Sequence, residues 1–225
     1  QFGDTTPTKS TGYGAVYIAS GTVTMEDGKI YNNFMNGFGG GVYMQTGTFT
    51  MKGGEITENT SQSGSGVYVD SGSFSMTGGK IQDNHGSGTN YKGAGIFTKV
   101  DIKFGGSAEV SGNEDSNIYL NTGARLCIVS RLEGISGISM AAPEEGYFTT
   151  GLGELGTAAN FTSDSGEYGI GVEDAEAFLG FEVTFDTQGG YFKEEEELEA
   201  GDRKESRTVV VRPGMTTTLP VVYRN

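Results

Sequence analysis

The sequence lacks tryptophan and contains one cysteine, Cys127, and one histidine, His85. A single cysteine cannot form an intramolecular disulfide. Structural zinc sites combine several cysteine and histidine ligands, and many catalytic zinc sites need at least two histidines. The composition therefore excludes a cysteine–histidine zinc cluster and a paired-histidine zinc site, and we expect no metal and no other cofactor.

Basic residues are scarce. Lysine and arginine total 15 against 29 acidic residues, which gives a formal net charge of −14. Nucleic acid and anionic membrane surfaces both attract basic faces, so this balance argues against either partner. No apolar run approaches the roughly 18 residues that a membrane-spanning helix needs. We therefore expect no nucleic-acid partner and no direct membrane insertion.

Proline is rare, at four residues, whereas glycine is abundant, at 39 of 225. The absence of a strict Gly-X-Y period excludes collagen. Valine, isoleucine, phenylalanine, tyrosine and methionine recur at fixed places, which argues against disorder. The glycines are best explained by tight turns between many short strands.

Three short motifs recur in the same order along the chain. The first is Gly14-Ala-Val-Tyr-Ile18, which returns at 40–44, 65–69, 94–98 and 116–120. The second is Gly21-Thr-Val-Thr-Met25, repeated at 47–51 and 72–76, and the third is Lys29-Ile-Tyr-Asn-Asn33, repeated at 55–59, 80–84 and 109–113. Such a fixed period is typical of a stacked array.

The motifs predict an all-β fold. Each motif alternates apolar and polar residues over a length too short for a helix, which indicates a strand. Three short strands in about 25 residues are typical of a right-handed parallel β-helix, in which each coil buries its apolar face only by stacking on its neighbours. We expect about five coils and a C-terminal β cap, because an open last coil would present unpaired strand edges.

Alternation also predicts which side chains point inward. The expected apolar columns are Val16/Ile18, Val42/Met44 and Val67/Val69 in the first strand; Val23/Met25, Phe49/Met51, Phe74/Met76 and Ile102/Phe104 in the second; and Ile30, Ile56, Ile81 and Val110 in the third.

An asparagine follows the third apolar column in each of four coils: Asn33, Asn59, Asn84 and Asn113. Asparagine tolerates a left-handed bend and can bond stacked neighbours through its amide. We interpret these residues as a structural column at a corner of the coil.

The charged positions of the third motif alternate in sign from coil to coil, as Lys29, Glu55, Lys80 and Glu109. Strands of adjacent coils lie about 4.8 Å apart, so opposite charges can pair across coils. Asp70 and Lys99 form a further expected pair.

The outward residue of the first strand is aromatic in every coil: Tyr17, Tyr43, Tyr68, Phe97 and Tyr119. These rings should stack in one column, which alone would stabilise the sheet. Two other interpretations remain open. A C-terminal segment could cover the column, or the column could be exposed as a platform for a glycan or a partner protein.

The repeat resembles the right-handed β-helix repeats of secreted, adhesin-like surface proteins of gut and oral bacteria, through the pattern Gly39-Gly-Gly-Val-Tyr43 … Gly47-Thr-Phe-Thr-Met51 … Ile56-Thr-Glu-Asn59. It is similar in style to repeats of chlamydial polymorphic membrane proteins. The resemblance covers about residues 14–180. It implies an extracellular or cell-surface setting, with the export signal and anchor outside this chain.

The tail carries a second resemblance. Phe181-Glu-Val-Thr-Phe-Asp-Thr-Gln-Gly-Gly190 and Thr208-Val-Val-Val-Arg-Pro-Gly-Met-Thr-Thr-Thr-Leu-Pro220 resemble strands of the Listeria–Bacteroides repeat, the internalin-type B-repeat. The acidic run Glu194–Glu197 lengthens its first connection, and the chain stops before its usual aromatic ending. We therefore divide the chain into coils (1–134), a closing coil with cap (135–180) and a partial B-repeat-like segment (181–225).

These observations favour a non-catalytic surface module with an adhesin-like or stalk role, which contacts a surface glycan or a host protein through the aromatic column. The alternative is a carbohydrate-active enzyme, because parallel β-helices include polysaccharide lyases and hydrolases. Such enzymes need clustered carboxylates, whereas Glu58, Asp70, Asp83 and Asp101 are spread one per coil. On this hypothesis, changing Tyr43 and Tyr68 to serine abolishes glycan binding and leaves the fold intact.

Overall fold

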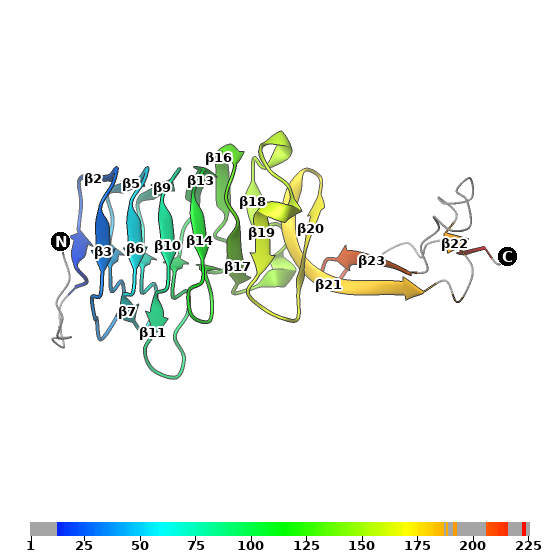
Figure 1. Cartoon of the computed structure of the whole chain (residues 1–225), viewed down its shortest axis with the longest axis horizontal. Coiled ribbons are helices and arrows are strands. Elements are labelled where there is room, and N and C mark those ends of the chain that lie inside the picture. Colours follow the sequence, from blue (N-terminus) through cyan, green and yellow to red (C-terminus); the bar gives the residue numbers. More distant parts are fainter. Residues whose placement is uncertain (1–12, 187, 189–190, 193–205, 216–221, 224–225) are drawn as a thin grey trace.

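The computed structural model describes residues 13–186, 188, 191–192, 206–215 and 222–223. It confirms the all-β fold and the parallel β-helix, in which three parallel sheets wind into a β-solenoid. Figure 1 shows the coils side by side along the long axis, with the N-terminal coil at one end and a C-terminal hairpin at the other. None of the helices among the described residues is long and apolar enough to cross a membrane.

The first motif of each repeat forms one seven-stranded sheet. Its strands, in spatial order, are β1 Val16–Ile18, β4 Val42–Met44, β8 Val67–Val69, β12 Ile96–Thr98, β15 Ile118–Leu120, β17 Ser136–Met140 and β19 Phe161–Ser163. The strands are rich in β-branched and aromatic residues, which fit a pleated and half-buried surface.

The other two motifs form the remaining faces. The second sheet contains β2 Thr22–Met25, β5 Thr48–Met51, β9 Ser73–Met76, β13 Ile102–Gly106, β16 Leu126–Leu132 and β18 Thr149–Thr150. The third contains β3 Lys29–Tyr31, β6 Glu55–Thr57, β10 Lys80–Gln82 and β14 Glu109–Ser111. A small parallel pair, β7 Thr60–Ser61 and β11 His85–Gly86, lies beside the longest loop (Figure 1).

The solenoid has about six turns, so the expected count of about five coils was low. The third sheet ends at β14, whereas the first two sheets continue to β19 and β18. The last turns thus lose the third motif while keeping parallel register, as in the pairing of Ile118 with Ile138. Motif counting misses these turns because they no longer carry the full repeat.

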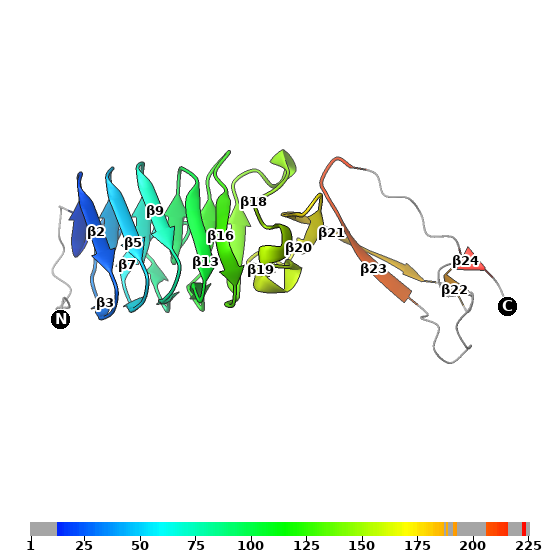
Figure 2. The same cartoon turned by 90° about the horizontal axis from the view of Figure 1, so that it is seen from above.

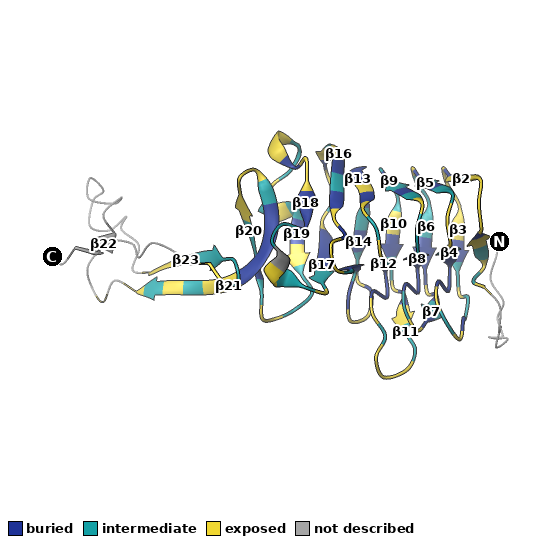
Figure 3. Ribbon diagram, turned by 180° about the vertical axis from the view of Figure 1, so that it is seen from behind, coloured by how far each residue is buried: buried dark blue, intermediate teal, exposed yellow. Residues whose placement is uncertain are grey.

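The core lies inside the coils and contains the predicted inward residues. Figure 3 shows buried residues along the strands of successive coils. Val42, Phe49, Met51, Phe74 and Met76 are all fully buried. The Phe49 and Phe74 rings stack with centroids 5.3 Å apart. Val16 and Val23, in the first coil, are only partly buried.

The four alternating charges form two ion pairs across coils. Lys29 contacts Glu55 at 2.8 Å, and Lys80 contacts Glu109 at 2.9 Å. The hydrogen bond from Lys80 lowers the pKa of Glu109. Exposed pairs of this kind contribute only about 0–1 kcal/mol each, so they favour the register more than they stabilise the fold.

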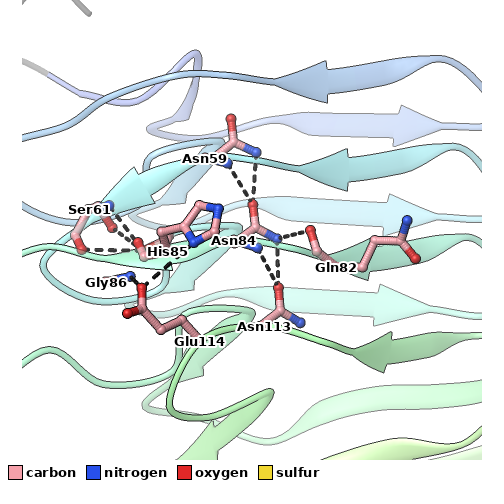
Figure 4. A network of polar contacts seen from close by, with 9 residues as sticks. Asn59, Ser61, Gln82, Asn84, His85, Gly86, Asn113 and Glu114 are labelled. Carbon is pink, nitrogen blue, oxygen red and sulfur yellow. Dashed lines mark hydrogen bonds and ion pairs between the residues drawn. The ribbon is translucent and has the colours of Figure 1, made fainter.

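The asparagine column forms a continuous chain of amides (Figure 4). The Asn59 Nδ2 donates to the Asn84 Oδ1 at 3.0 Å, and the Asn84 Nδ2 donates to the Asn113 Oδ1 at 2.8 Å. Each backbone N–H of these residues donates to the same oxygen as its own side chain. The Asn84 Nδ2 also reaches the carbonyls of Ile56 and Gln82. Every coil is therefore tied to the next at this corner.

The chain of amides extends beyond the four predicted members. The Asn113 Nδ2 donates to the Asn117 Oδ1 at 3.0 Å, and the Asn117 Nδ2 donates to the Asp164 Oδ1 at 2.7 Å. Asp164 also accepts the Asn117 backbone N–H through Oδ2. A carboxylate only accepts hydrogen bonds when ionised, so Asp164 ends the column. Burial raises the pKa of Asp164, and the two bonds from Asn117 oppose that rise.

The left-handed bend at this corner lies one residue before the column asparagines, which corrects the sequence-based interpretation. Asn32, Glu58 and Asp83 have φ values of 55°, 56° and 53°, and Gly112 occupies the equivalent position with φ 66°. The bend turns the next side chain inward. The asparagines are thus placed by the bend rather than forming it.

A β-hairpin packs against the last turn. Strand β20, Gly169–Glu173, pairs antiparallel with β21, Glu176–Asp186, and the turn between them has positive φ at Asp174 and Ala175. Ala177, Phe178 and Leu179 are buried, and Phe148 N–H donates to the Ala177 carbonyl. Short 3₁₀ helices precede it: η1 Pro143–Glu145, η2 Gly153–Leu155 and η3 Ala158–Asn160.

Strand β21 continues past residue 180, where the sequence suggested a boundary, and pairs antiparallel with β23 Ser206–Val211 (Figure 2). Strands β22 Tyr191–Phe192 and β24 Val222–Tyr223 also pair antiparallel. The acidic run Glu194–Glu197, residues 189–190 and the turn segment 216–220 of the B-repeat resemblance lie outside the described residues.

Replacing Asn84 with alanine should lower the free energy of unfolding by about 3 kcal/mol, because Asn59 and two buried carbonyls lose their partners. Asn33→Ala, in the half-buried first coil, should cost about 1 kcal/mol. Urea unfolding followed by circular dichroism measures both. Equal losses in the two variants would contradict a cooperative amide column.

Candidate functional site

The predicted aromatic column is present on the outer face of the first sheet. Parallel register places Tyr17, Tyr43, Tyr68, Phe97 and Tyr119 over one another. Ring centroids of successive pairs from Tyr43 onward lie 5.3, 5.0 and 5.4 Å apart, with interplanar angles of 6°, 3° and 9°. Tyr17 is tilted by 31° to Tyr43 at 5.7 Å.

Two of the five rings of this column are buried, so it is not an open platform along its whole length. Tyr68 is 4% exposed and Tyr119 is 9% exposed, whereas Tyr43 and Phe97 are half-buried. A surface about 20 Å long, as the sequence suggested, is therefore unavailable to a ligand.

The described cover comes from loops of the coils themselves. Isolated bridges link Phe38 to Ser63 and Ser63 to Lys92, so the loops leading into successive first strands lie in register. Gly64 has φ 57°, and a Cβ added there would lie 2.7 Å from Tyr68 Cβ. The loop can therefore approach the ring only because this residue is glycine.

Two lysines lie over covered rings. Lys92 Nζ lies 4.8 Å from the Tyr119 ring centroid and donates to the Tyr119 hydroxyl at 2.8 Å. Lys99 Nζ lies 5.6 Å from the Tyr68 centroid and 2.6 Å from Asp70. The hydrogen bond to Asp70 raises the pKa of Lys99. Cation–π contacts of this kind favour a fixed arrangement of column and loops.

Aromatic surface is exposed at the N-terminal end of the column. Tyr13, Tyr17 and Phe38 are 54%, 36% and 46% exposed, and we call them, with half-buried Tyr43, the aromatic patch. Tyr13 stacks on Tyr17 with centroids 3.7 Å apart and planes within 7°. The Tyr17 hydroxyl donates to Gln45 Oε1, and its hydrogen bond with Tyr13 raises the pKa of Tyr17.

Stacking decides which parts of the patch can receive a ligand. A ring inside the column has neighbours on both faces and offers solvent only its edge. Tyr13 stacks on Tyr17, its ring centroid also lies 5.6 Å from that of Tyr43, and it is the most exposed aromatic ring among the described residues. Tyr13 therefore lies beside the first two rings of the column and offers one exposed ring on which a single flat ring fits. A long chain laid along the column would meet edges and covering loops.

Sequence reasoning did not identify Tyr13 or Phe38. Tyr13 precedes the first Gly-x-Val motif, and Phe38 lies in a loop whose sequence differs between coils. Phe38 stacks on Tyr68 at 4.8 Å, a contact that appears only when loop and strand are folded together.

Other chemically capable residues are engaged in structure. His85 Nδ1 lies 3.7 Å from Glu114 Oε2, which also accepts the Gly86 N–H, and the His85 carbonyl accepts from Ser65 Oγ (Figure 4). Cys127 is half-buried, and burial raises the pKa of its thiol. Within the described part of the chain, no three His, Cys, Asp or Glu side chains are grouped to hold a metal ion.

Tyr68→Ser should lower the free energy of unfolding by about 3 kcal/mol, because a buried ring is removed from the middle of the column. This corrects the expectation that changing Tyr43 and Tyr68 leaves the fold intact. The matched variant Tyr17→Ser, at the exposed end, should cost less than about 1 kcal/mol. Urea titration distinguishes them, and a Tyr68→Ser loss as small as that of Tyr17→Ser would contradict the burial of the column.

No protein-family model, curated protein sequence or solved structure matches this chain. Arguments about function therefore depend on the geometry and chemistry of its own residues.

Proposed function

We propose that this chain is a non-catalytic binding module of an exported bacterial surface protein, and that the aromatic patch contacts a glycan. The single observation that carries the proposal is the exposed, stacked pair Tyr13–Tyr17 beside the first rings of a column whose rings Tyr68 and Tyr119 are buried. Exposed aromatic groups of this kind are common in contact surfaces.

A sugar ring fits the chemistry of the patch. One face of a pyranose carries mostly C–H groups and stacks on an aromatic face, while its hydroxyls bond to neighbouring polar groups. Gln45, which bonds to the Tyr17 hydroxyl, and the tyrosine hydroxyls supply such groups at the rim. A few polar groups around apolar rings are typical of small-ligand sites.

The net charge of the chain restricts the class of sugar further. The net charge of −14 repels anionic ligands at long range. The exposed Tyr13 ring admits one sugar ring. We therefore expect a neutral sugar at the end of a chain or branch to bind better than an internal unit of an acidic polysaccharide.

A glycan array tests this proposal with the purified chain. Binding to neutral terminal sugars should fall at least tenfold in Tyr13→Ser/Tyr17→Ser, because the stacking face is lost. The matched control Val129→Ser/Ile135→Ser removes two exposed apolar side chains elsewhere on the solenoid and should bind normally.

Two results would contradict the proposal. Unchanged glycan binding in the tyrosine variant would remove the patch from consideration, and silence across the array would favour a spacer or a protein-binding adhesin. Release of unsaturated uronate or reducing ends from a polysaccharide, with or without calcium, would instead indicate the alternative, a carbohydrate-active enzyme.

A further inference from the structure

The third coil carries an insertion. Successive first-strand residues Val16, Val42 and Val67 are 26 and 25 residues apart, but Ile96 follows Val67 by 29. The extra residues lie in the loop between β11 and β12, the longest loop projecting from the solenoid in Figure 1. Insertions in a repeat form loops on one face, which is often the binding face.

This loop forms a cleft with the preceding coil. The cleft is open to solvent on one side, has a volume of about 290 Å³ and is lined by Gln62, Ser87, Gly88, Thr89, Asn90 and Tyr91. Every lining residue is uncharged, in a chain whose composition is strongly acidic. The lining thus offers amides, hydroxyls and one aromatic ring.

The wall of the cleft is fixed by the coils. Strand β11 pairs in parallel with β7, and Ser87 N–H donates to the Ser61 carbonyl at 2.8 Å. The Tyr91 ring packs directly on Gly86, where an added Cβ would lie 1.9 Å from Tyr91 Cδ2. The ring is therefore held against β11 and cannot keep this position beside a larger residue.

The polar groups of the cleft have unused hydrogen-bonding capacity. Gln62, Thr89 and Asn90 are exposed and Ser87 is half-buried, and among the described residues none of these four side chains makes a hydrogen bond or ion pair within the protein. Amides and hydroxyls both donate and accept. Four such groups beside an aromatic ring match the alternating hydroxyls and C–H face of a sugar.

We propose that this cleft binds a single neutral sugar residue, at a second site that is independent of the aromatic patch. The volume suits one small polar ligand rather than a chain. Anionic sugars are disfavoured because the Glu114 and Asp115 carboxylates lie near Tyr91, and both contribute, after burial, to raising its pKa.

The test is a titration of the ¹⁵N-labelled full chain with single sugars, followed by amide chemical shifts. The probes are galactose, mannose, glucose, N-acetylglucosamine and N-acetylgalactosamine, with glucuronate as the anionic comparison. At least one neutral sugar should shift the amides of residues 62 and 86–91 with saturation, and glucuronate should not.

Two variants locate the site, and two more serve as controls. Asn90→Ala and Gln62→Ala should each weaken binding roughly three- to tenfold, as expected for the loss of a hydrogen bond. The matched control Asn36→Ala removes an exposed amide from the loop of the first coil and should leave affinity unchanged. Tyr13→Ser/Tyr17→Ser should also leave these shifts unchanged, which separates this site from the proposed glycan contact at the patch.

The proposal is overturned if no neutral sugar shifts residues 62 and 86–91 at millimolar concentration. It is also overturned if Asn90→Ala and Gln62→Ala bind as the parent chain does, or if glucuronate binds equally well. Loss of array binding in Tyr13→Ser/Tyr17→Ser bears on the aromatic patch alone, because the cleft is formed by different residues.

Discussion

Parallel register between coils is the constraint on which the rest of the structure depends, and the amide chain from Asn33 to Asp164 fixes it at one corner. Because each coil lies directly over the previous one, equivalent residues become neighbours, and each face acquires one chemistry. The first face is aromatic. The third face carries opposite charges that alternate from coil to coil. The second face presents hydroxyls in its first three coils, from Thr22, Thr24, Thr48, Thr50, Ser73 and Ser75.

The sequence was sufficient to predict the contacts between residues that recur in every coil. Residues at the same position in successive motifs become neighbours, because the coils stack in parallel register. This rule predicts the inward columns, the Lys29–Glu55 pair and the stacking of Tyr43 on Tyr68. Prediction failed where the period ends. The last turns lack the third motif. Asp164, which accepts a hydrogen bond from Asn117, lies 47 residues away from it in the sequence. The left-handed bend falls on Asn32, Glu58, Asp83 and Gly112. Asparagine, aspartate and glycine favour that conformation, but glutamate does not, so the position gives an incomplete signal in the sequence.

The candidate sites could be predicted only in part for the same reason. Tyr17 and Tyr43 belong to the repeat, but their exposure depends on loops whose sequences differ between coils. Phe38, in one such loop, stacks on Tyr68, and the loop around Gly64 approaches the same ring. Repeating positions thus serve mainly to hold the coils together. The two proposed contacts lie at departures from the period, at Tyr13, which precedes the first motif, and at the insertion around Asn90. Stable coils allow these irregular segments to vary without loss of register.

Native-state hydrogen exchange would test the central claim about register most directly. If the amide chain ties every coil to the next, the backbone N–H groups of Asn59, Asn84 and Asn113 should exchange only through global unfolding. Their opening free energies should then equal those of buried first-sheet residues such as Val67, while residues 87–91 exchange fast. Exchange of the asparagine amides through local opening, well below the global free energy, would contradict the account, because the coils would then hold their register without the amide column.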